Sequence, residues 1–155
     1  MRLFLPLILL VPLGTLAQPV TNITVTNATA EQVMKGQYTP SDFAATQVID
    51  DHEVILCEMR WGLNPDSLKS YLVQLEAFHT RHSYSDTVSA TTGIGAARRW
   101  ALGKFQQFSE TNEDRLLPTY LKFDWPNGSC GDAFGWKNVL AVLPGSDNSD
   151  HQLII

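Results

Sequence analysis

An amphipathic helix is predicted between residues 65 and 80. Its apolar side chains recur at helical spacing on one face, and they are Leu68, Tyr71, Leu72, Leu75 and Phe78. Asn64 can cap this helix with its side chain, Pro65 suits the first helical position, and Asp66 places a negative charge in the first turn. The pattern predicts a helix from about Pro65 to Thr80.

A second helix is predicted from about Ile94 to Phe108, after a polar stretch that ends at Gly93. The apolar side chains that share its face are Ile94, Ala97, Ala101, Phe105 and Phe108. Because each helix has one apolar face, each is expected to pack against a sheet or against the other helix.

Short apolar runs rich in β-formers follow the second helix. They read LLPTYLKFD, NVLAVLPG and HQLII, and the segments DWPNGS and PGSDNSD between them have the composition of turns. Helices followed by closely spaced strands predict an α/β fold in which helices flank a sheet. The final run stops at Ile155 with the apolar, β-branched residues of a buried strand. The sheet is therefore expected to be incomplete in this chain.

Two earlier stretches have weaker patterns. The run HEVILCEM, residues 52–59, alternates in part, with Val54 and Leu56 on one side and Ile55 and Cys57 on the other, which predicts a strand. Residues 18–37 are rich in Thr, Asn and Ala without a sustained apolar period, which predicts a partly disordered start of the mature chain. We expect an N-terminal extension over residues 18–45 and one domain over residues 46–155.

The first 17 residues have the composition of a secretory signal peptide. Arg2 provides a positive charge, LFLPLILLVPL an apolar stretch, and Thr15, Leu16 and Ala17 a cleavage site of mostly small residues, with cleavage expected after Ala17. A membrane-spanning helix needs about 20 apolar residues, and this run is shorter and interrupted by prolines. The chain is therefore expected to be secreted, without a membrane partner.

The 155 residues carry a formal net charge of −5. Nucleic acids and anionic lipids bind to basic patches, and no basic segment stands out in the sequence. A nucleic acid is therefore not expected as a partner.

Cys57 and Cys130 are the two cysteines of the chain. In an oxidising compartment they can form a disulfide with each other, which would stabilise a small domain by roughly 2–4 kcal/mol. The sequence leaves open whether they pair, stay reduced and buried, or pair with a cysteine outside this chain. Asn22, Asn27 and Asn127 each begin an Asn-x-Ser/Thr triplet and are candidate glycosylation sites in a eukaryotic host.

Three clusters were weighed as candidate chemistry. Gly93-x-Gly95 lacks the third glycine and the preceding apolar strand of a dinucleotide fingerprint, so its glycines are interpreted as a tight entry into the second helix. His79 and His82 have the spacing of some zinc ligands but no supporting Glu or Cys, which favours a surface or capping role. The dense polar run from Asp50 to Glu53 is interpreted as a solvated turn. No Gly-x-Ser-x-Gly motif is present.

The order of these segments resembles the beginning of a known enzyme family. The matching segments are NPDSLKSYLVQLEAFHTRHSYSDTVSATTGIGAARRWALGKFQQFS, then LPTYLKFDW, then NVLAVLPGSDNSDHQLII, which span Asn64 to Ile155. They are similar to the N-terminal part of secreted zinc aminopeptidases of the M28 metallopeptidase family, and a weaker likeness covers Glu31 to Arg60. The resemblance implies a zinc-exopeptidase-like sheet flanked by helices.

For a full-length protein, the resemblance also implies peptide substrates and two zinc ions held by His, Asp and Glu. In the family a Gly-His-x-Asp segment with the first ligands follows the strand that matches HQLII, and the other ligands and the general-base Glu come later. The resemblance therefore places no catalytic or metal-binding residue in this chain, and the chain alone is expected to be inactive.

Two other functions stay open. One is a secreted, non-enzymatic module that binds a partner through residues 50–60 and nearby loops, or an inactive peptidase remnant. The other is an enzyme that uses His79, His82 and the Asp50 to Glu53 cluster as ligands or acid–base groups.

Overall fold

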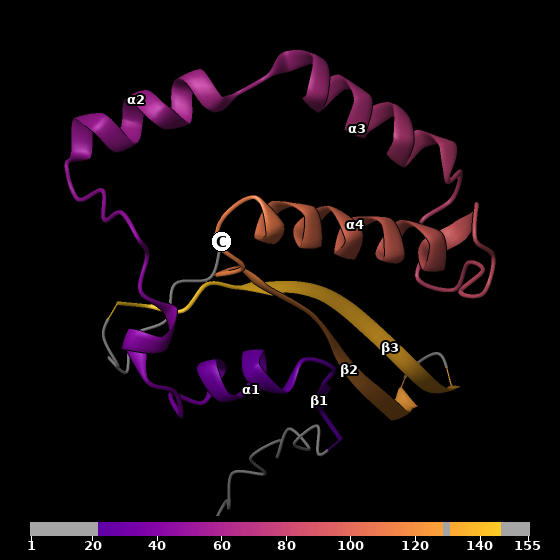
Figure 1. The fold of residues 1–155 in the computed structure, drawn as a ribbon. Coiled ribbons are helices and arrows are strands. Elements are labelled where there is room, and N and C mark those ends of the chain that lie inside the picture. The colour runs from indigo at the N-terminus through magenta and orange to yellow at the C-terminus, as the bar shows by residue number, and fades with distance from the viewer. Residues whose placement is uncertain (1–21, 129–130, 147–155) are drawn as a thin grey trace, which may run out of the picture.

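The structure is a computed structural model that describes residues 22–128 and 131–146 (Figure 1). Its elements in chain order are β1 (Thr24–Val25), α1 (Ala28–Met34), the 3-10 helix η1 (Pro40–Phe43), α2 (His52–Gly62), α3 (Pro65–Ala77), α4 (Gly93–Glu110), β2 (Leu117–Gly128) and β3 (Gly131–Val142). The helices and the sheet confirm the α/β class. The segment HQLII and the predicted signal peptide lie outside the described residues.

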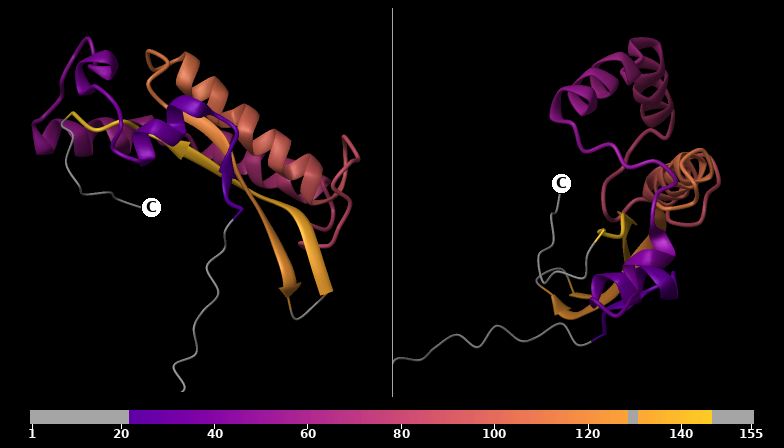
Figure 2. Two further views of the ribbon diagram at one scale, coloured as in Figure 1. Left: turned by 90° about the horizontal axis from the view of Figure 1, so that it is seen from below. Right: turned by 60° about the vertical axis from the view of Figure 1, so that its left-hand side comes forward.

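The sheet is antiparallel, in the strand order β1-β2-β3. Leu117 pairs with Val142 at one end of the β2–β3 hairpin and Gly128 pairs with Gly131 at the other. The register shifts between Phe123 and Trp125, and the hairpin is visibly twisted (Figure 2). The predicted turn DWPNGS is wrong over most of its length, because β2 continues to Gly128.

Helix α4 lies along the hairpin and contacts both of its strands (Figure 1). It begins at Gly93 and ends at Glu110, and α3 runs from Pro65 to Ala77, so both predicted helices are confirmed. As predicted, Asn64 caps α3: its side-chain oxygen accepts hydrogen bonds from the N–H groups of Asp66 and Ser67. Capping residues therefore set the start of α3 as the sequence indicates.

The predicted strand at residues 52–59 is wrong, because this segment forms helix α2 from His52 to Gly62. Asp51 caps it, with its Oδ1 accepting a hydrogen bond from the Val54 N–H at 3.0 Å. Glu53 lies in the first turn and Arg60 in the last, and both charges favour a helix through its dipole. These terminal signals outweigh the β-propensity of Val54 and its neighbours.

Residues 24–34, within the stretch predicted to be partly disordered, contain β1 and α1. Thr24 and Val25 pair with β2, and the side chain of Asn27 caps α1 by accepting hydrogen bonds from the N–H groups of Thr29 and Ala30. Thr119 of β2 is almost fully buried, and its hydroxyl accepts a hydrogen bond from the Asn27 N–H at 3.0 Å. This segment therefore contacts the sheet through β1 and α1. The domain boundary at residue 45 stays a prediction.

A small apolar core joins the end of α3 to the start of α4. Phe78, Ala96 and Ala97 are buried there, with Leu75 and Trp100 packed against them. Trp100 makes edge-to-face ring contacts with Phe78 and Tyr71 at centroid distances of 6.1 and 5.8 Å.

The rest of the α2–α3 pair has no described partner. No residue of α2 or α3 is buried, and the two helices form an arch on the side of α4 away from the sheet (Figures 1 and 2). The large apolar side chains that are exposed along the arch are Val54, Ile55, Leu56, Met59, Trp61, Leu63, Leu68, Leu72 and Val73. Of the predicted apolar face, Tyr71, Leu75 and Phe78 lie against α4, whereas Leu68 and Leu72 are exposed. No helix among the described residues is long and apolar enough to cross a membrane.

Replacing Asn27 is expected to destabilise the fold, because its side chain caps α1 and its Nδ2 donates a hydrogen bond to the Pro118 carbonyl. We expect Asn27→Ala to lower the free energy of unfolding by about 1–2 kcal/mol in urea titrations of protein from a host that adds no glycan. Asn27→Asp keeps the side-chain oxygen that caps α1, so its free energy of unfolding should fall by less. Equal losses in the two variants would show that the cap contributes nothing.

Gly95 and Gly103 of α4 make a matched pair. A Cβ on Gly95 would overlap the Thr87 carbonyl, whereas a Cβ on Gly103 meets no atom within 4 Å. We expect Gly95→Ala to lower the free energy of unfolding by about 1–3 kcal/mol. Gly103→Ala should raise it by about 0.5–1 kcal/mol, because alanine favours a helix. Thermal and urea unfolding measure the free energies of unfolding of both variants. Stabilisation by Gly95→Ala would contradict the close approach of Gly95 to the Thr87 carbonyl.

Candidate functional site

Residues 79–92 form a loop that closes over the first turn of α4, and we call it the capping loop. The first three N–H groups of the helix all find acceptors in this part of the chain. Gly93 donates to the Phe78 carbonyl at 2.9 Å, Ile94 to the Ser85 hydroxyl at 2.9 Å, and Gly95 to the Asp86 carbonyl at 3.0 Å. A helix N-terminus is an anion site when its N–H groups are free, and here the protein's own oxygens engage them.

The two glycines make this closure possible. Gly93 has φ of +79°, in the left-handed region, which confirms the interpretation of a tight entry into the helix. A Cβ on Gly93 would overlap the Asp86 carbonyl, and one on Gly95 would overlap the Thr87 carbonyl. Gly93-x-Gly95 therefore brings two backbone segments together.

Asp86 and Arg99 fix the shape of the capping loop. The Asp86 carboxylate accepts hydrogen bonds from the N–H groups of Val88 and Ser89 at 2.6 and 2.9 Å. Arg99 of α4 donates to the carbonyls of Thr87, Val88 and Ser89. The backbone N–H groups of Ser89 and Val88, with a smaller contribution from the Arg99 charge, hold the pKa of Asp86 below its ordinary value.

Sequence reasoning did not single out Asp86 or Arg99. The local sequence Asp-Thr-Val-Ser fits a turn in which an aspartate bonds the N–H groups two and three residues ahead, so Asp86 could have been found. Arg99 could not, because its partners depend on how the loop folds onto α4.

The candidate ligands His79 and His82 lie in the capping loop. His79 directly follows the end of α3 in the left-handed region, with φ of 58°. His82 accepts a hydrogen bond from the Tyr84 N–H at its Nδ1, and its ring lies 5.6 Å from that of Tyr84. Both histidines therefore lie where α3 ends and the capping loop begins.

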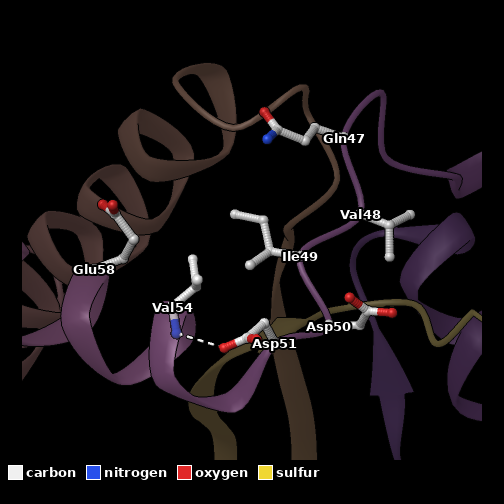
Figure 3. A pocket seen from close by; sticks show the side chains of 7 residues that line it. All are labelled: Gln47, Val48, Ile49, Asp50, Asp51, Val54 and Glu58. Carbon is white, nitrogen blue, oxygen red and sulfur yellow. Dashed lines mark hydrogen bonds between the residues drawn. The ribbon is translucent and has the colours of Figure 1, made fainter.

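The Asp50 to Glu53 cluster lies at the start of α2, at the opposite end of the arch from the capping loop (Figure 1). It borders a pocket of about 470 Å³. The residues that line this pocket are Gln47, Val48, Ile49, Asp50, Asp51, Val54 and Glu58 (Figure 3). Asp51 bonds the Val54 N–H, as the dashed line in Figure 3 shows. The fold does not bring this cluster near His79 and His82.

The described side chains do not form a group of zinc ligands. Within residues 22–128 and 131–146, no group of three or more His, Cys, Asp or Glu side chains lies close enough together to hold a metal ion. Three or four such ligands are the minimum for a zinc centre in an enzyme. The described residues therefore do not fit a zinc site, and we assign them no hydrolytic step.

The remaining predicted sites are partly described. Cys57 is exposed on α2, and Cys130 lies outside the described residues, so the disulfide stays a prediction. Asn22 is exposed, and its Oδ1 accepts a hydrogen bond from the Asp124 N–H at 3.3 Å. Asn27 differs, because the nitrogen to which a glycan would attach donates to the Pro118 carbonyl at 3.3 Å. The side chain of Asn127 lies outside the described part.

The chain is similar in sequence to curated proteins named as metalloproteases. It is 31% identical over 98 residues to a protein of Pyrenophora teres f. teres named a probable zinc metalloprotease, covering 61% of this chain and 21% of that protein. Proteins with the same name from Pyrenophora tritici-repentis and Phaeosphaeria nodorum are each 28% identical over 91 residues. Those matches cover 57% of this chain and 21% and 18% of the relatives. No family model and no solved structure matches the chain.

The matched segment spans about a fifth of the length of these curated relatives. The relatives are named as probable zinc metalloproteases, and the similarity is to that part of them. The relatives' names specify neither the number of zinc ions nor a preference for N-terminal residues.

The Asp86 carboxylate should make stability depend on pH. Its pKa in the folded chain lies below the ordinary value of 3.8, so the carboxylate stabilises the fold above that value. This stability is lost as the pH falls through the lower, folded pKa. We expect NMR titration of the side-chain carboxyl carbon to give a midpoint below 3.8, and Asp86→Asn to remove part of the acid-induced loss of stability. A midpoint at or above 3.8 would contradict the hydrogen bonds to Val88 and Ser89.

Proposed function

We propose that this chain is the N-terminal part of a secreted, zinc-dependent aminopeptidase of the M28 type, which hydrolyses N-terminal residues of peptides. The single observation that carries the proposal is the similarity of 57–61% of the chain to fungal proteins named probable zinc metalloproteases. The resemblance of Asn64 to Ile155 to secreted M28 aminopeptidases supports the finer assignment. The composition of residues 1–17 supports secretion.

In this proposal the described residues form a structural scaffold and contribute no catalytic group. Helix α4 covers the β2–β3 hairpin, the capping loop fixes its first turn, and α1 and β1 extend the sheet domain. The zinc ligands and the general base belong to other residues of the full-length protein. The chain alone is then unable to bind a pair of zinc ions or to hydrolyse peptides.

A non-enzymatic binding module, or an inactive peptidase remnant, is the second candidate. The observation that favours it is the exposure of α2, where Met59 is 65% and Trp61 80% exposed. Large apolar patches of this kind mark interaction surfaces on many soluble proteins.

The first test is to sequence the transcript beyond the codon for Ile155. We expect an open frame that encodes a Gly-His-x-Asp segment and later Glu, Asp and His residues. The product of that frame should hydrolyse leucine p-nitroanilide, lose activity to a chelator and regain it with zinc, while the 155-residue chain shows no turnover. A stop codon directly after Ile155 would overturn the peptidase proposal and favour the binding module.

A further inference from the structure

Arg98 of α4, Lys122 of β2 and Lys137 of β3 are half-buried cations on elements that contact one another. The Arg98 Nη1 lies 3.5 Å from the Lys137 carbonyl oxygen, to which it donates a weak hydrogen bond. Lys137 of β3 stands directly opposite Lys122 of β2 in the strand register. We call Arg98, Lys122 and Lys137 the basic cluster.

No ion pair to the basic cluster is found among the described side chains. Like charges placed directly opposite each other on antiparallel strands repel. The ion pair found among those side chains joins Lys35 to Glu31, on α1, and involves no member of the cluster. Asp124 lies two residues beyond Lys122, but its Oδ1 accepts a hydrogen bond from the Gly135 N–H at 2.6 Å. Its carboxylate is thus held by the backbone of the hairpin.

Tyr120 forms an aromatic wall beside the cluster. The Lys137 Nζ lies 5.7 Å from the centroid of the Tyr120 ring, a cation–π distance. Burial raises the pKa of the Tyr120 hydroxyl, and the nearby charges of Arg98 and Arg99 act against that rise. Partial burial beside an aromatic ring weakens solvent screening, so the attraction of the cluster for an anion is stronger than on an open surface.

We propose that the basic cluster binds a carboxylate group. A carboxylate placed between Lys122 and Lys137 would relieve their repulsion, and the planar guanidinium of Arg98 suits two parallel hydrogen bonds to its oxygens. The net charge of −5 on the whole chain disfavours a long polyanion, because repulsion accumulates beyond the cluster. The carboxylate can come from a small organic acid or from the C-terminus of a peptide. This inference needs no zinc and does not depend on the proposed peptidase function.

The test uses the full chain and amide NMR spectra at constant, low ionic strength. The probes are acetyl-glycyl-glycine, its C-terminal amide, and succinate. We expect saturable shifts at Tyr120, Lys122 and Lys137 with the carboxylate peptide and none with the amide. Equal shifts with succinate identify a general carboxylate site, and shifts with the peptide alone identify a C-terminus site. Shifts that are the same for the amide, or that spread evenly over the surface, overturn the proposal.

Variants provide the second measurement. The double variant Lys122→Gln, Lys137→Gln should weaken carboxylate binding about tenfold or more. Without a ligand it should raise the melting temperature at low salt by about 1–4 °C, because the repulsion is removed. Lys69→Gln, at an exposed lysine on α3, is the matched control. It should change neither the carboxylate affinity nor the melting temperature. If the double variant unfolds, Arg98→Gln replaces it in the binding titration. Unchanged binding in the variants would falsify the assignment.

Discussion

The close approach of the capping loop to the first turn of α4 is the constraint on which the rest of the structure depends. Gly93 and Gly95 lack the Cβ atoms that would overlap the carbonyls of Asp86 and Thr87. Because the loop lies that close, it satisfies the first N–H groups of α4 and places Phe78 against Ala96 and Ala97. It also places Tyr84 against Trp136 of β3, with ring centroids 5.7 Å apart. One contact therefore connects α3, α4 and the hairpin.

Burial is distributed unequally around this contact. The buried apolar residues of the described chain lie in α1, at the end of α3 and in α4, while every residue of α2 is exposed. A helix of 11 residues is marginal in water on its own, and the cap of Asp51 adds only about 1 kcal/mol. If the chain is part of the proposed full-length peptidase, further elements of that protein would pack against this face. In the 155-residue chain, α2 and the first half of α3 are its least stabilised helical parts.

The sequence predicted the elements whose ends carry their own signals. Asn64 and Pro65 gave the start of α3, and the apolar spacing gave α4 to within two residues of each end. The prediction failed at residues 52–59, where partial alternation and β-branched residues indicate a strand but Asp51 caps a helix. It also missed α1, whose Asn27 cap begins a helix of 7 residues, too short to show a full apolar period. Contacts such as Arg98 with Lys137 depend on strand register, and no local pattern contains that information.

The candidate ligands illustrate the same limit at the level of chemistry. Spacing in sequence made His79 and His82 candidates, yet a metal centre needs three or four side chains that converge in space. The capping loop directs His82 to the backbone of Tyr84, and the acidic cluster at Asp50 lies at the far end of the arch. Two histidines at a suitable spacing are thus present, but no third ligand converges with them among the described residues. What the described residues supply is a rigid helix on a twisted hairpin, the kind of support that holds catalytic groups contributed by other segments in fixed positions.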